Sequence, residues 1–360
     1  MLSKSRISWI CLVVLAVLVK LLSLYPSVVE KYYSTGCYPW IARLQRLLLG
    51  WIPFSIGDIL YGMAVIWLLA GLVSLIRKCW RREAGLAFWG GFLRRFVFIF
   101  LLIYIVFYGC WGLNYTRLGI ADQLQLEVKP YSNEELTELV QVLVTHLNDL
   151  DSTARLTRGA LSQKHLLFAE AVEAYDSLAA HDARFAYRTS SIKPSLYSYL
   201  EDYLGFGGYY NPFSGEAQVN TTLPVFTLPF TACHEMAHQL GYAKENEANF
   251  VGYLSARSSA DPAFRYSVYF DLYQYAAREL YVRDSTLLKP LKQQLKPAIR
   301  EDFKELQRFS RKYASPLEPA MMKLYARYLR ANGQPQGIMT YNEVTAWLIA
   351  YARKNGMETI

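Results

Sequence analysis

Three long apolar runs dominate the first third of the chain. They predict transmembrane helices over about 7–24, 57–76 and 96–113. Lys20 is the single charge in the first run, and the second run is uncharged from Ile59 onward. Each run is near the lower end of the length that a helix needs to cross roughly 30 Å of hydrocarbon. A secretory signal peptide is the alternative for the first run, but no clear A-x-A cleavage site follows it.

Basic residues predict how these helices are oriented. Six of them lie between the second and third runs: Arg77, Lys78, Arg81, Arg82, Arg94 and Arg95. Loops rich in Lys and Arg stay in the cytoplasm. We therefore expect a bacterial inner-membrane protein with a cytoplasmic N-terminus and everything after Asn114 in the periplasm. The stretch around Trp40 and Trp51, and the pair Trp111 and Tyr115, are expected at the membrane interface.

The polar half of the chain has mostly helical periodicity. A helix is predicted from a cap at Ser132 or Asn133, and later helices are expected over Glu245–Ala256, Phe264–Tyr281 and Ala298–Tyr313, with two more near the C-terminus. Before them, "GFGGYYNPFSGEAQVN" predicts a β-hairpin that pairs Tyr209–Tyr210 with Ala217–Asn220. The chain therefore divides into a membrane domain, 1–113, and an outer, mainly helical domain, 114–360.

Composition and charge limit which molecules the basic residues of the chain can be expected to bind. The chain has 360 residues, of which 53% are hydrophobic, and a formal net charge of +8. Much of the positive excess is concentrated beside the membrane runs, and the polar half carries no basic stripe interleaved with aromatics. Membrane lipid is therefore the expected partner of these charges, and nucleic acid is not. The five cysteines are too scattered for a disulfide framework.

The stretch "PFTACHEMAHQLG" carries the candidate chemistry. His234 and His238 are four residues apart, so on a helix both imidazoles can face one metal ion. Glu235 lies about 100° around the helix, where it is poorly placed as a ligand and well placed to contact a water on the metal. In HExxH sites the metal acidifies this water and the glutamate takes its proton. The motif predicts Zn²⁺ as cofactor and Glu235 as general base.

A catalytic zinc site usually has three protein ligands. Gly241 can end the helix that carries the two histidines. The spacing is similar to the metzincin signature, but Lys244 occupies the position of that family's third histidine. The following "ENEAN" is similar to the E-x-x-A-[DN] element of glutamate-ligand zincins. That likeness implies Glu245 as third ligand and Asn249 as a residue that orients a histidine. Glu247 is the alternative ligand.

The whole layout resembles an uncharacterised family of bacterial membrane proteins described as zinc metalloproteases. The most specific part of the resemblance is the 205–250 block, with "GYYNPFSGEAQVN", "HEMAHQLG" and "ENEANF". The resemblance implies three N-terminal spans followed by a zincin-like α+β domain. It assigns no substrate.

Together these observations predict a membrane-anchored zinc metallopeptidase that acts on a peptide or protein substrate. We expect Ala217, Gln218 and Val219 to form an outer strand that binds the substrate beside the zinc. Tyr266 is a candidate donor to the oxyanion. Two alternatives stay open: a non-catalytic receptor or scaffold with a structural zinc, and a zinc hydrolase of non-peptide amides.

Overall fold

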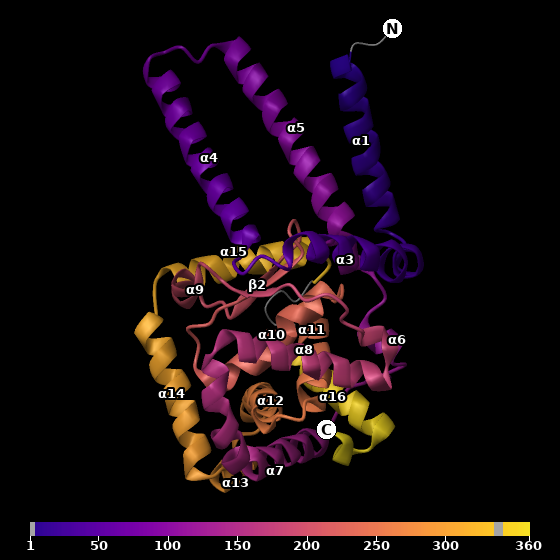
Figure 1. Cartoon of the computed structure of the whole chain (residues 1–360), viewed down its shortest axis with the longest axis vertical. Helices are drawn as coiled ribbons and strands as arrows, with labels where there is room; N and C mark the ends of the chain where they lie inside the picture. Colours follow the sequence, from indigo (N-terminus) through magenta and orange to yellow (C-terminus); the bar gives the residue numbers. More distant parts are fainter. Residues whose placement is uncertain (1–3, 335–340) are drawn as a thin grey trace.

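The computed structural model describes residues 4–334 and 341–360. Long helices rise from one side of a larger, mainly helical domain (Figure 1). The α-helices are α1 (Lys4–Leu22), α2 (Pro26–Val28), α3 (Tyr38–Leu49), α4 (Ile56–Trp80), α5 (Leu86–Cys110), α6 (Ile120–Gln123), α7 (Asn133–Thr157), α8 (Lys164–His181), α9 (Ser198–Leu204), α10 (Leu228–Gln239), α11 (Glu245–Ser258), α12 (Pro262–Arg283), α13 (Ser285–Gln294), α14 (Pro297–Tyr313), α15 (Leu317–Ala331) and α16 (Tyr341–Asn355). The strands are β1 (Ile192–Pro194), β2 (Gly208–Asn211) and β3 (Glu216–Val219).

Within the part of the chain that the structure describes, two helices, α4 and α5, are long and apolar enough to cross a membrane. Each has 25 residues, which at the rise of an α-helix gives a length of roughly 38 Å. The α1 helix qualifies only when it is combined with Pro26–Leu49 across a 100° bend. The prediction for 96–113 needs correction, because α5 begins at Leu86 and ends at Cys110. Residues 112–116 turn into a buried 3-10 segment.

The basic residues predicted for a loop mostly lie within helices. Arg77 and Lys78 belong to the last turn of α4, and Arg94 and Arg95 lie inside α5. The turn between these two helices is at the end farthest from the outer domain, and the described N-terminus of α1 lies at that end as well (Figure 1). Arg77, Lys78, Arg81 and Arg82 and the outer domain therefore lie at opposite ends of α4 (Figure 1).

The separation of charge from the outer domain leads to a prediction about topology. A reporter that is active only outside the cytoplasm is expected to be active when fused after Asn114 and inactive when fused after Glu83, between α4 and α5. Reporter activity in whole bacteria measures both fusions. The opposite pair of results would place the outer domain in the cytoplasm.

The core of the outer domain is formed by helices packed around α10 and α12. The predicted N-terminal cap of α7 is confirmed, since Ser132 and Glu135 form a reciprocal capping box. The α12 helix packs along α7, and α11 packs against α10 and α8. Buried side chains such as Leu143, Phe250 and Phe270 join these helices in one apolar cluster. This core fixes the position of α10, the helix that carries HExxH.

A three-stranded sheet covers one side of α10, in the order β1-β3-β2. The predicted hairpin is confirmed, because β2 pairs antiparallel with β3 and places Tyr209 opposite Gln218. The β1 strand adds to the other side of β3 in parallel, with Lys193 opposite Gln218. Ala217 and Val219 point into the core as the alternation predicts.

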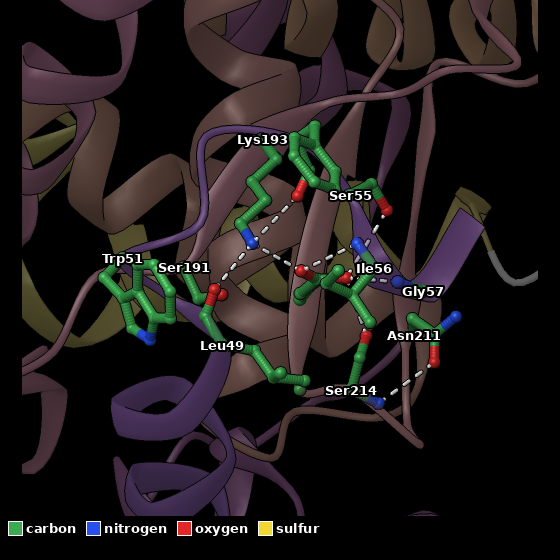
Figure 2. Close-up of polar contacts among 12 residues, drawn as sticks. Leu49, Trp51, Ser55, Ile56, Gly57, Ser191, Lys193, Asn211 and Ser214 are labelled. Carbon is green, nitrogen blue, oxygen red and sulfur yellow. Dashed lines mark hydrogen bonds and ion pairs between the residues drawn. The ribbon is translucent and has the colours of Figure 1, made fainter. Parts of the chain in front are cut away.

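The segment between α1 and α4 packs against the outer domain, although the sequence assigns it to the membrane domain. The hydroxyl of Tyr38 donates to the carbonyl of Gln239 at the end of α10 (2.9 Å). At the start of α4, the buried carboxylate of Glu216 accepts the backbone N–H of Gly57 (2.6 Å) and pairs with Lys193 (2.5 Å). The Lys193 ammonium also donates to the carbonyl of Leu49 (2.8 Å; Figure 2). These bonds therefore fix the N-terminus of α4 on the sheet.

Candidate active site

The HExxH helix and the helix after it are joined by a sharp turn. Gly241 has φ of +87°, a conformation that favours glycine, and it ends α10 as the sequence predicts. The chain then reverses into α11, which crosses α10 closely at Gly252. A Cβ at position 252 would be 3.1 Å from the backbone nitrogen of His234. This close crossing brings the first turn of α11 against the two histidines.

His234, His238 and Glu245 form one cluster. The Nε2 atom of His234 is 3.3 Å from one carboxylate oxygen of Glu245, and the Nε2 atom of His238 is 3.7 Å from the other. Two ligands of a tetrahedral zinc, each bonded at about 2.0–2.1 Å, are roughly 3.3 Å apart. The candidate ligand atoms of all three residues lie within 4.8 Å of one another. The donor set, two imidazoles and one carboxylate, is one that Zn²⁺ accepts.

The surroundings of His238 favour metal binding. Its Nδ1 atom is 2.7 Å from the carbonyl of Tyr242, which can only accept, so Nδ1 carries the proton and Nε2 is left for a ligand bond. Burial lowers the pKa of His238 to about 4, which keeps the ring neutral. The indole N–H of Trp111 donates to the carbonyl of His238 (3.0 Å). The Tyr242 contact holds the ring in the orientation that a ligand needs, and the Trp111 bond fixes the backbone that carries it.

The electrostatics of the cluster favour a positive charge between its members. Burial is the largest single effect on His234 and opposes its charge, but the hydrogen bond with Glu245 and the charges of Glu235 and Glu245 together outweigh burial and raise the pKa of His234 to about 9. Burial is also the largest effect on Glu245 and opposes its ionisation, yet the hydrogen bond with His234, the electrostatic interaction with both histidines and the hydrogen bond from Tyr325 together lower the pKa of this carboxyl to about 2. A proton on His234 thus balances the Glu245 carboxylate. A metal cation would take over that balance and displace the proton.

Glu235 is separate from this cluster and faces the same cavity. Burial raises the pKa of its carboxyl to about 8, and its Oε2 atom has no hydrogen-bond partner among the described residues. A buried unpartnered carboxyl oxygen is uncommon outside functional sites. A positive charge nearby would lower this pKa and so favour the carboxylate, the form that a general base requires. Gly208 lies against it: a Cβ at that position would be 2.9 Å from Glu235 Oε1.

The cavity at this site has a volume of about 550 Å³. Several parts of the chain line it: α4 and α5 (Tyr61, Phe107), the 3-10 segment and its flank (Trp111, Tyr115), β2 and its flanks (Gly208, Tyr210), the two site helices (His234, Glu235, His238, Glu245, Asn249), α12 (Asp271, Tyr275) and α15 (Met322, Tyr325, Tyr328). The hydroxyl of Tyr325 donates to Glu245 Oε1. No sequence pattern distinguishes Trp111 or Tyr325 as site residues among the many aromatic residues of the chain.

Of the two acids proposed as third ligand, the structure brings Glu245 to the histidines. Glu247 faces the other way and accepts a hydrogen bond from Lys244 (3.1 Å). Asn249 lies one turn after Glu245, lines the cavity and interacts with His234. Neither Asn249 Nδ2 nor His234 Nδ1 has a hydrogen-bond partner among the described residues, so the orienting role of Asn249 stays a prediction.

Two predicted contributors to substrate binding are wrong. Tyr266 is buried in the helical core, where its hydroxyl donates to Asp302 (2.6 Å), and it does not line the cavity. The strand that contains Ala217, Gln218 and Val219 is not an outer strand, because β1 and β2 pair with it on both sides. Its backbone groups are already used within the sheet, so it has no edge to offer a peptide.

The outer strand beside the cavity is β2. Among the described strands it pairs with β3 alone. The carbonyl of Gly207 accepts the N–H of Asn220 (2.9 Å). Because antiparallel pairing alternates, the peptide groups of Gly208 and Tyr210 are directed to the open edge. The free strand edge beside the cavity therefore belongs to β2 and not to the strand for which it was predicted.

Fold and site together define a protein with apolar helices of membrane-spanning length and a buried His-His-Glu cluster in an outer helical domain. The chain belongs to the family described as Protein of unknown function (DUF3810), whose model matches residues 33–349. Comparison with curated proteins and with solved structures gave no match.

Proposed function

We propose that this protein is a membrane-anchored, zinc-dependent peptidase of zincin type, whose outer domain faces the periplasm. The observation that carries the proposal is the combination of one buried donor set, His234, His238 and Glu245, with a separate buried carboxyl, Glu235, in the same cavity. A structural zinc site has no need of the fourth group. The open edge of β2 supports a peptide substrate, since an extended chain can pair with it.

In this proposal His234, His238 and Glu245 would hold the ion. When bound, Zn²⁺ supplies Lewis acidity that polarises a carbonyl and acidifies water. Glu235 accepts a proton from the attacking water as the new carbon–oxygen bond forms. It then donates that proton to the leaving amine as the carbon–nitrogen bond breaks. The carbonyl of Tyr242 holds the proton of His238 on Nδ1, and Tyr325 orients Glu245.

Metal content of purified full-length variants tests the ligand assignment. Glu245→Gln is expected to weaken zinc binding more than about 100-fold, as severely as His238→Ala. Asn249→Ala is expected to weaken it less, about 10–100-fold, because its effect passes through a histidine. Elemental analysis of the proteins after dialysis against graded zinc buffers gives the affinities.

Glu247→Ala is the matched control for the metal experiment. It removes a buried carboxylate two residues from Glu245 and is expected to leave zinc affinity within a few-fold of the parent. Loss of zinc from this variant, with retention by Glu245→Gln, would contradict the assignment and with it the proposed catalytic centre.

A further inference from the structure

The candidate active site lies directly against the membrane-spanning helices. Tyr61, in the second turn of α4, stacks on Tyr209 of β2 with ring centroids 6.0 Å apart. Phe107, in the last turn of α5, lines the same cavity as His234 and Glu235. Trp111 follows the end of α5, and its ring is 6.1 Å from that of His238. The spans themselves therefore form part of the cavity wall.

The helices α4 and α5 are not packed against each other above this cavity (Figure 1). The α1 helix packs along α5, whereas α4 stands apart from both (Figure 1). Apart from Gly57 and Asp58 in its first turn, α4 has no buried side chain. The described residues of α5 include none that is buried either. Along most of their length, α4 and α5 therefore present exposed side chains to the surroundings and are not covered by each other.

The face of the outer domain beside the spans is apolar. The helices α3, α9 and α15 lie along this edge of the domain (Figure 1). They and their flanks expose large hydrophobic side chains: Trp40, Leu48, Trp51, Tyr199, Leu200 and Leu324. Exposed tryptophan and leucine on a surface next to membrane spans are typical of contact with the lipid interface. Such contact would hold the cavity at the level of the membrane surface.

From this placement we propose that the substrate is the juxtamembrane segment of a membrane-anchored polypeptide, which enters laterally between α4 and α5 and pairs with β2. The inference rests on the proposed peptidase function and adds a substrate class to it. A cavity walled by two spans and held at the membrane surface is poorly accessible to a folded soluble protein. A chain that leaves the bilayer beside the spans passes within reach of Tyr61, Gly208 and Glu235.

Full-length, zinc-loaded protein in liposomes tests this proposal with single-span peptides. Each peptide has an oligoleucine span and a randomised segment, joined either directly or through a Gly/Ser spacer of about 20 residues, which moves the segment roughly 25 Å away. Cleavage is expected in the directly joined segments and to fall at least about tenfold with the spacer, although both forms are equally concentrated in the membrane. Equal cleavage of both forms, or preference for the same segment free in solution, would overturn the proposal.

A second measurement separates this inference from the proposed chemistry. The Glu235→Gln variant is mixed with the same peptides carrying a photoreactive residue next to the span. Cross-links to α4 and β2 are expected from the directly joined peptide and not from the spacer form. If these cross-links form but the parent protein cleaves none of the peptides, the lateral binding site is supported and the proposed peptidase activity is refuted. Absence of cross-links from the anchored peptide would overturn the lateral entry, whatever is cleaved in solution.

Discussion

Glu235→Gln is expected to reduce peptide hydrolysis by about 10²–10⁴-fold, the usual contribution of a general acid–base group. Glutamine has nearly the same shape as glutamate but cannot take the proton of the attacking water. Because Glu235 is not among the three clustered donors, zinc content should stay the same as in the parent. Turnover of a cleavable peptide and elemental analysis of the same sample measure both quantities.

Tyr266→Phe is the matched control for the Glu235 experiment. It removes one polar group from the same domain, but its hydroxyl contacts Asp302 and lies outside the cavity. Hydrolysis by this variant should be close to that of the parent. Activity that survives in Glu235→Gln and is lost in Tyr266→Phe would reverse the roles given to these two residues and refute the mechanism.

Glu216→Ala is expected to destabilise the protein by about 3–5 kcal/mol, because it leaves the ammonium of Lys193 buried without its partner. Both side chains of this pair are nearly inaccessible, with 3% and 0% of their surface exposed. The substitution also removes the acceptor for the N–H groups of Ile56 and Gly57 at the start of α4. Thermal unfolding in detergent, followed by circular dichroism, measures the loss.

A double variant distinguishes loss of the ion pair from loss of packing. Lys193→Met with Glu216→Gln removes both charges and keeps an acceptor for the first turn of α4, so it should unfold at a higher temperature than Glu216→Ala. The exposed pair Lys304–Glu301 provides the surface control. Glu301→Ala should leave the unfolding temperature unchanged, since exposed ion pairs contribute little. Equal decreases of the unfolding temperature in Glu216→Ala and in the double variant would show that the unpaired buried charge of Lys193 does not cause the destabilisation.

Local pattern was sufficient to predict several parts of the candidate site. The 3.6-residue period of a helix puts His234 and His238 on one face wherever the helix lies. The "ENEAN" likeness indicated Glu245, and Gly241 indicated the turn that brings α11 back. The hairpin followed from the turn residues between two short β-prone runs. Each of these features depends on residues close together in the sequence.

Other features depend on contacts between distant segments and were predicted wrongly or missed. Trp111 and Tyr115 were assigned to the membrane interface, yet both are buried against the outer domain. An aromatic residue at the end of a span looks the same in sequence whether it meets lipid or protein. The sequence predicts β3 as an outer strand because β1 is only three residues long and gives little sequence signal of its own.

Neighbouring residues are enough to predict the apolar helices, the two-histidine face of α10 and the alternation along β3, because helix and strand periods are local properties of the chain. Which acid meets the histidines, which strand has a free edge and how closely α4 and α5 approach the cavity follow only from the packing of distant segments. Those three outcomes depend on how α11, β1 and α5 pack against α10 and the sheet. Such packing follows from the shape and burial of side chains far apart in the chain, which no local pattern records.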